Sequence, residues 1–261
     1  IAATYLAISR IGVLLADFSR PFAMNILSSL THTHARDVSI FRRASQVILK
    51  FTFILVMAVL LLVIPLADII IGFILGAPYV AGYVLVPFFV IAGGIVIIES
   101  IFVRMGIVLE RTNALIIALA LALLPRLTLY TSLLVIEYPQ NLFYLPLVLA
   151  IFVVISHSIL IIIIFLAFRD IITNCMKDVA KILLIGGLLA YVSWCLLILV
   201  KLNRILLACI ILVLYILIMG RAGIFKAMDF IILRKALPRN LSKLVVLLEK
   251  ITKKHPNHNV G

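Results

Sequence analysis

Six runs of predominantly apolar residues follow one another along most of this chain. They cover residues 47–71, 84–103, 114–136, 142–168, 182–200 and 205–219. A helix needs roughly 20 apolar residues to cross a bilayer core of about 30 Å, and the last run reaches that length only if it continues to residue 225. Backbone amides in hydrocarbon must be satisfied within their own segment, so each run is predicted to be a helix. The sequence therefore predicts an all-α, polytopic transmembrane bundle.

The overall composition indicates that lipid surrounds these helices. Of 261 residues, 66% are hydrophobic and only 13% are charged, and the mean hydropathy is +1.33. A soluble domain is about half apolar and a quarter charged, and a soluble fold of this size cannot bury so large an excess. Membrane lipid is therefore the first expected partner.

A seventh run, residues 1–27, is long enough to span a bilayer but carries Arg10, Asp17 and Arg20. On a helix Arg10 and Asp17 lie within about 20° of each other, and Arg20 follows Asp17 by one turn and can pair with it. These charges form either an internally neutralised structural stripe or part of a polar lining. The chain opens in this run without a secretory signal, so we expect it to be part of a longer protein.

The net charge of +13 comes mainly from the links between the runs. Four basic residues lie in 28–50, two in 104–113, three in 169–181 and nine after Gly220, whereas the intervening links hold only Lys201 and Arg204. Such alternation follows the positive-inside rule, so we expect no nucleic-acid partner. The pattern predicts a protein of the cytoplasmic membrane with its C-terminus inside the cell.

The tail after Pro238 combines apolar residues at helical spacing with lysines along their flank. That pattern is typical of an amphipathic helix in the membrane interface, where each basic residue contributes about 1 kcal/mol near anionic headgroups. We expect lipid contacts from Lys243, Lys250, Lys253 and Lys254. The alternative is a docking site for a partner enzyme.

Five segments result from these observations. They are a polar transmembrane helix (1–27), a cytoplasmic basic link (28–46), a four-helix membrane module (47–168), two further transmembrane helices (169–225) and a basic amphipathic cytoplasmic tail (226–261). The first segment brings the expected number of spans to about seven.

Ionisable side chains inside the apolar runs are the main candidates for function, because they are costly there unless they face water or a partner. Arg126 lies near the middle of 114–136, with Tyr130 on the same face. Either Arg126 pairs with Glu99 of the neighbouring run, or Arg126 lines a solvated cavity for an anionic substrate. His157 is either a hydrogen-bonded packing residue or a protonatable coupling residue. Arg10 is a second candidate for the cavity, and Glu99 and Asp17 for coupling or ion pairing.

Familiar catalytic and metal-binding patterns do not occur in the sequence. We find no H-E-x-x-H, G-x-S-x-G or P-loop pattern, and the three cysteines, Cys175, Cys195 and Cys209, have no metal-ligand spacing. We therefore expect neither an enzyme nor a metal or other cofactor.

Three stretches resemble polysaccharide-export flippases, of the multidrug/oligosaccharidyl-lipid/polysaccharide flippase superfamily. ATYLAISRIGVLLADFSRPF resembles the helix that closes their first conserved region. FTFILVMAVLLLVIPLADIIIGFILGAPYVAGYVLVPFFVIAGGI resembles their next module, in which an outer turn joins two spans, and GIVLERTNAL resembles the charged link of a helix pair. The order fits over residues 2–169, although EYPQNLFYLPLVLAI lacks the glycines usual in the family.

The resemblance implies a fold and an activity. Flippases of this kind have about twelve to fourteen helices in two lobes, so the chain resembles the C-terminal lobe of a 14-helix flippase. Its expected partners are a lipid-linked oligosaccharide and the missing N-terminal lobe, and its expected activity is translocation of glycan precursors across the membrane. The alternatives are a non-transporting scaffold that docks glycan-synthesis enzymes and a multidrug or cation antiporter of the same superfamily.

Overall fold

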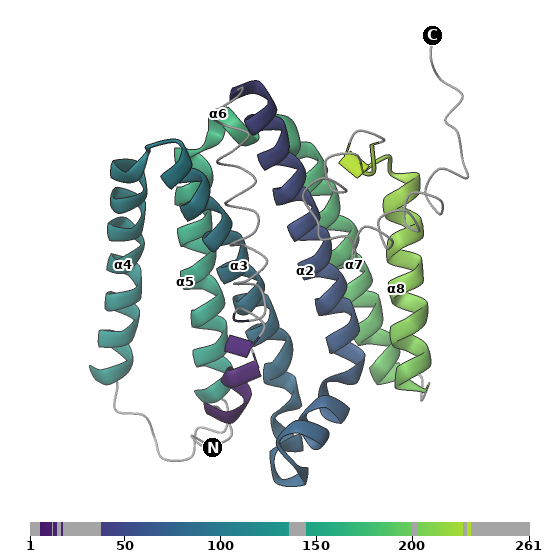
Figure 1. The fold of residues 1–261 in the computed structure, drawn as a ribbon. Helices are drawn as coiled ribbons and strands as arrows, with labels where there is room; N and C mark the ends of the chain where they lie inside the picture. Colours follow the sequence, from purple (N-terminus) through teal and green to yellow (C-terminus); the bar gives the residue numbers. More distant parts are fainter. Residues whose placement is uncertain are drawn as a thin grey trace.

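The computed structural model describes residues 6–11, 13–14, 17, 38–135, 145–199, 203–226 and 229–230. Every α-helix and 3-10 helix of these residues lies in one bundle, shown in Figure 1, and the described residues contain no strand. The prediction of an all-α protein is confirmed for this part of the chain. The α-helices are α2 (Val38–Ile74), α3 (Val86–Val108), α4 (Thr112–Val135), α5 (Leu145–Ala167), α6 (Arg169–Ile172), α7 (Met176–Leu199) and α8 (Arg204–Arg221). Two 3-10 helices, η1 (Ala77–Leu85) and η2 (Thr173–Cys175), join them.

Five segments of the described chain are long and apolar enough to cross a membrane, as expected of a multi-pass membrane protein. They are Ser39–Ile74, Ala77–Val108, Leu147–Ala167, Arg169–Leu199 and Arg204–Arg221. Helix α4 has 24 residues, but only the backbone is described for part of its second half. The expected polar helix 1–27 lies mostly outside the described residues.

Helix α2 is longer than the apolar run that predicted it. It begins at Val38, nine residues before the run does, and its 37 residues measure about 55 Å at about 1.5 Å per residue. Between Lys50 and Asp68 it carries no charge. These two residues are about 27 Å apart along the helix, close to the thickness of a bilayer core. Lys50 and Asp68 therefore mark the two edges of the apolar layer.

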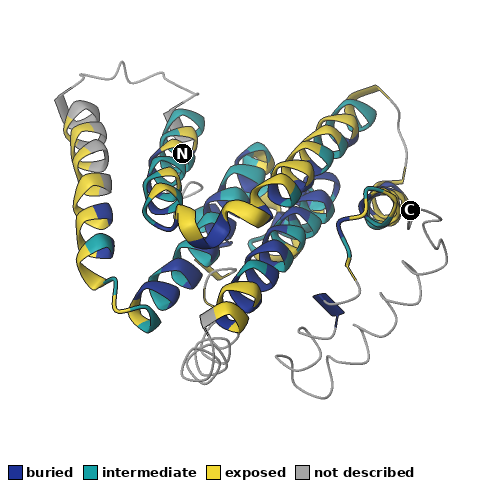
Figure 2. Ribbon diagram, turned by 90° about the horizontal axis from the view of Figure 1, so that it is seen from above, coloured by how far each residue is buried: buried dark blue, intermediate teal, exposed yellow. Residues whose placement is uncertain are grey.

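The helices pack in a row with α2 near its centre. Helix α2 contacts α3 on one side and α7 and α8 on the other, while α3 packs against α5 and α5 packs against α4. Viewed from above, buried residues concentrate where the central helices meet, and exposed residues lie along the outside (Figure 2). Leu61, Phe102, Ile164 and Tyr215, from four different helices, are completely buried.

Two glycines allow close helix contacts with neighbouring residues of α2. Gly94 of α3 lies against Val56, and Gly186 of α7 lies against Met57. Small residues at such crossings let helix backbones approach closely, which is a common mode of packing in membranes. A Cβ atom at Gly94 would overlap the short, branched side chain of Val56, whereas one at Gly186 meets the flexible end of Met57.

We expect Gly94→Ala to destabilise the bundle by about 1–3 kcal/mol, because overpacking forces the α2–α3 contact apart. Gly187→Ala is the matched control, since no atom lies within 4 Å of a Cβ at that position. For Gly187→Ala we expect no destabilisation, because alanine is more favourable than glycine inside a helix. Thermal unfolding of the detergent-solubilised protein measures both effects. Equal stability of the two variants would contradict the close contact.

Candidate functional site

An acidic and a basic side chain meet inside the bundle, between α3 and α5. Nδ1 of His157 lies 3.0 Å from Oε1 of Glu99, and the two side chains are only 20% and 15% exposed. On α5, His157 stands between two serines within an otherwise apolar helix. The hydroxyl of Ser158 donates to the carbonyl of Val154 in the same helix at 2.8 Å. The histidine is therefore directed to its partner helix, whereas this neighbouring serine satisfies its hydrogen bond locally.

Counting residues along the helices gives the depth of this pair. Glu99 precedes Arg111 by 12 residues and His157 precedes Asp170 by 13, and Arg111 and Asp170 bind each other. The Glu99–His157 pair thus lies about 18–20 Å from that contact. The side-chain amide of Gln46 donates to the carbonyl of Ile171, the residue after Asp170, at 2.5 Å. Gln46 precedes Lys50 by about one turn of α2, so Asp170 lies about one helical turn outside the level of Lys50. Glu99 and His157 therefore lie close to halfway between the two edges of the apolar layer.

The predicted cavity residues fall in less completely described parts of the chain. Arg126 and Tyr130 lie on α4, which packs against α5, but their side chains are outside the described residues. Arg126 follows the start of α4 by 14 residues, or about 21 Å, and so lies at a depth similar to that of His157. Arg10 and Asp17 are exposed residues of the N-terminal segment. Arg20 and the tail lysines Lys243, Lys250, Lys253 and Lys254 lie outside the described residues.

Glu99 and His157 were both candidates from sequence, but their pairing was not predicted. The proposed partner of Glu99 was Arg126, whose side chain lies outside the described part of α4. Glu99 and His157 are 58 positions apart on different helices, and no spacing rule connects such residues. His157 lies near the middle of its apolar run, but Glu99 lies only four residues before the end of the run 84–103, so hydropathy alone did not indicate a shared depth.

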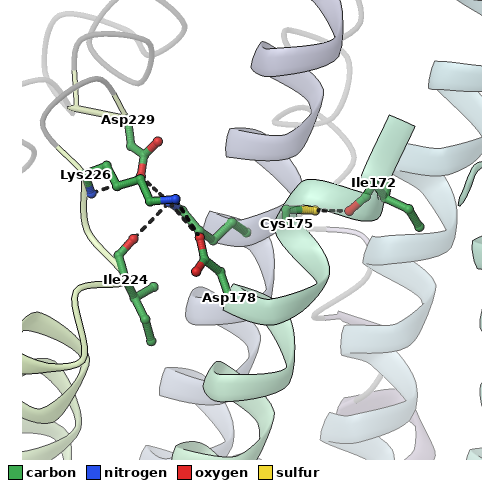
Figure 3. A network of polar contacts seen from close by, with 7 residues as sticks. Ile172, Cys175, Asp178, Ile224, Lys226 and Asp229 are labelled. Atoms are coloured by element: carbon green, nitrogen blue, oxygen red, sulfur yellow. Dashed lines mark hydrogen bonds and ion pairs between the residues drawn. The ribbon is translucent and has the colours of Figure 1, made fainter. Parts of the chain in front are cut away.

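A second polar cluster, which the sequence analysis missed, surrounds the buried Lys50 (Figure 3). The side chain of Lys50 is 4% exposed; its ammonium forms an ion pair with Asp229 and donates to the carbonyl of Ile224 at 2.9 Å. Asp178 of α7 lies 3.9 Å from the same ammonium and 3.6 Å from that of Lys226. The Lys226 amide also donates to Asp229 at 3.1 Å. This Lys50 cluster joins α2, α7 and the segment that follows α8.

Aromatic rings strengthen the same junction. Phe225 and Phe230 stack with their ring centroids 5.9 Å apart, and Phe51 of α2 lies 6.0 Å and 6.4 Å from them. The segment after α8 is therefore held to α2 by both charge and apolar contact. From sequence, Lys50 was counted among the basic residues of the stretch 28–50, and it also falls inside the apolar run 47–71. The available signal was Asp229, the only acidic residue between Asp178 and Glu249.

At the other edge of the apolar layer, Arg204 of α8 forms an ion pair with Asp68 of α2. Asn203 caps the helix here, since its side-chain oxygen accepts a hydrogen bond from the Ile205 amide at 3.0 Å. Arg204 belongs to the one link that departs from the positive-inside pattern. The pair with Asp68 neutralises this arginine, which gives a local physical reason for the departure.

A further ion pair lies on the Lys50 side, outside the apolar layer. Arg111, in the turn between α3 and α4, donates to both carboxylate oxygens of Asp170 at 2.8 Å and 2.7 Å. These hydrogen bonds from the guanidinium to Asp170 raise the pKa of Arg111 above its ordinary value. The pair ties the α3–α4 turn to α6.

The described residues contain no group of three or more histidine, cysteine, aspartate or glutamate side chains able to hold a metal ion. What the structure does bring together are a mid-depth acid–histidine pair and ion pairs at both edges of the bundle. No family model, curated protein or solved structure matches this chain. The resemblance to flippases thus stays a prediction from the quoted motifs.

We expect Asp229→Asn to destabilise the protein by about 3–5 kcal/mol, because removing one partner of a buried ion pair leaves the other charge poorly compensated. Asp170→Asn is the control, since it breaks an ion pair with about 40% exposed side chains, where the expected loss is at most about 1 kcal/mol. The double variant Lys50→Met/Asp229→Asn is expected to recover part of the loss. Unfolding in detergent measures all three, and equal losses for Asp229→Asn and Asp170→Asn would show that Lys50 is not held as described.

Proposed function

We propose that this chain is a lobe of a membrane transporter of the polysaccharide-flippase type. The observation that carries the proposal is the Glu99–His157 pair close to the middle of the apolar layer. Ionisable groups at such depth are costly and commonly mark a substrate or ion path in membrane proteins. The flippase-like motifs supply the substrate class, a lipid-linked oligosaccharide, and the second lobe with which this lobe would work.

In this proposal the two halves of the bundle have different tasks. Helices α2, α7 and α8 are tied together by ion pairs at both edges and form the frame. Helices α3, α4 and α5 carry the polar groups at mid-depth, among them Arg126, whose permanent positive charge suits the diphosphate of a lipid-linked glycan. The Glu99–His157 pair is the coupling element, because an imidazole and a carboxylate are both groups that can take up and pass on a proton.

A second candidate, a proton-coupled antiporter for cationic compounds, is favoured by the carboxylate of Glu99. An acidic group at mid-depth attracts cations, and its protonation releases them. The two candidates differ in the charge of the transported molecule, so a transport assay separates them. A scaffold for glycan-synthesis enzymes, the third alternative, moves neither compound.

Transport by the full-length protein in proteoliposomes tests the role of the pair. We expect Glu99→Gln and His157→Gln each to lower the rate at which a fluorescent polyprenyl-diphosphate oligosaccharide changes leaflet, by at least about tenfold, because each removes a protonatable group. Ser158→Ala is the control, since this serine is the next residue on α5 and bonds only within its own helix among the described contacts.

The outcomes distinguish the candidates. Loss of glycan-lipid movement in both pair variants, with Ser158→Ala active, supports the flippase. Movement of a cationic dye but not of the glycan lipid identifies the antiporter, and movement of neither compound leaves the scaffold. Full glycan-lipid transport by Glu99→Gln and His157→Gln would remove the pair from the mechanism.

The proposed orientation places the Lys50 edge and the C-terminus in the cytoplasm. Ala77 in η1 and Glu110 after α3 are exposed and lie at opposite ends of the same span. In a variant without the native cysteines, we expect Ala77→Cys to react with a membrane-impermeant maleimide in intact cells. Glu110→Cys is expected to react only after the membrane is opened. The reverse labelling pattern would overturn the orientation.

A further inference from the structure

Helix α7 has two sharply different faces. Val179, Ile182, Gly186 and Ser193 are buried and lie within an arc of about 60°, and Gly186 of this face packs against α2. The opposite face, which we call the α7 strip, is formed by Lys177, Lys181, Leu184, Leu188 and Tyr191. At 100° per residue the strip covers an arc of about 80°.

All five side chains of the α7 strip are exposed on the bundle. Leu184, Leu188 and Tyr191 are 66%, 59% and 69% exposed. Since α7 is long and apolar enough to cross a membrane, this face meets lipid acyl chains. The two lysines stand at one end of the strip, one turn apart on the same face.

The depth of the lysines follows from the Lys50 cluster. Asp178 lies 3.9 Å from the ammonium of Lys50, which marks one edge of the apolar layer. Lys177 directly precedes Asp178 and so lies at that edge, with Lys181 about 6 Å deeper along α7. Long side chains at this level extend toward the headgroups, so both ammonium groups are placed at the depth of lipid phosphates.

The nearby acidic group does not neutralise these lysines. The carboxylate of Asp178 is turned toward Lys50 and Lys226, and its position is about 100° around the helix from Lys177. Within the described chain no carboxylate forms an ion pair with Lys177 or Lys181. The end of the strip therefore presents two positive charges to the headgroup layer.

We propose that the α7 strip is a binding site for one anionic phospholipid. Lys177 and Lys181 bind its phosphate, and an acyl chain lies along Leu184 and Leu188 toward Tyr191. Counted from Lys177 at the edge, Leu184 and Leu188 lie about 10 and 17 Å deep, which is about the depth of one leaflet, and Tyr191 lies just beyond the middle of the apolar layer. Basic residues at helix ends are a known recognition mode for anionic lipid headgroups. The site goes beyond the proposed function and does not depend on transport.

Lipid binding to the purified full chain tests this site. We measure the apparent dissociation constant for phosphatidylglycerol by native mass spectrometry from a neutral detergent, with phosphatidylcholine for comparison. Lys177→Gln/Lys181→Gln is expected to weaken phosphatidylglycerol binding by roughly 30-fold, at about fivefold for each lysine. Phosphatidylcholine binding is expected to stay unchanged.

The matched control is Arg42→Gln/Arg43→Gln, which removes two exposed basic residues on the same side of the bundle. These arginines are followed on α2 by Gln46, bonded to α6, and by the buried Val47, so no exposed apolar strip continues from them. We expect the control to bind phosphatidylglycerol within about twofold of the wild type, since no acyl-chain site adjoins its charges. Equal weakening in both double variants would show attraction by surface charge alone and overturn the site.

Two further outcomes also decide against the proposal. Unchanged phosphatidylglycerol binding in Lys177→Gln/Lys181→Gln overturns it directly. Competition by soluble glycerol phosphate at the lipid's own concentration would show that the lysines bind a free phosphate and that the apolar strip contributes nothing.

Discussion

A charge near hydrocarbon needs a partner, and this requirement organises the structure around α2. Seventeen uncharged residues separate Lys50 from Asp68, and each of these charges is met by an opposite charge from another element. At one edge Asp178 and Asp229 approach Lys50, and at the other Arg204 binds Asp68. Helix α2 is thus fixed to α7 and the segment after α8 at one end and to α8 at the other, over a length that matches the apolar layer.

Packing between these edges connects the frame to the helices that carry the mid-depth pair. Two adjacent residues of α2 make these contacts: Val56 packs against Gly94 of α3, and Met57 packs against Gly186 of α7. Helix α3 therefore rests against the frame on one side, and Glu99 of the same helix reaches His157 of α5. The Glu99–His157 contact therefore lies at mid-depth in the half of the bundle that, among the described residues, forms no ion pair with α2.

Hydropathy predicted the helices well because the bilayer requires long apolar runs, and α3, α5, α7 and α8 lie close to their predicted ranges. The start of α2 was missed because its first nine residues precede the apolar run. Hydropathy identifies the residues that lie in hydrocarbon, but not the residue at which a helix begins. Lys50 was counted only for its charge, because hydropathy does not show which side chains approach it. Contacts between distant helices, such as Glu99 with His157, depend on packing that one sequence does not reveal. Arg126 was selected from its depth and Tyr130 because it shares a helical face with Arg126, and the side chains of both lie outside the described residues.

The position of the ion pairs has a consequence for the response to voltage. Charges that lie at one edge of the apolar layer cross little of the transmembrane field, and the pairs Lys50–Asp229 and Asp68–Arg204 are also neutral in sum. These two pairs therefore experience little net electrical force. A proton that reaches Glu99 or His157 from either face crosses about half of the field, which corresponds to about 1 kcal/mol at 100 mV. Electrical work on this bundle is concentrated at its centre.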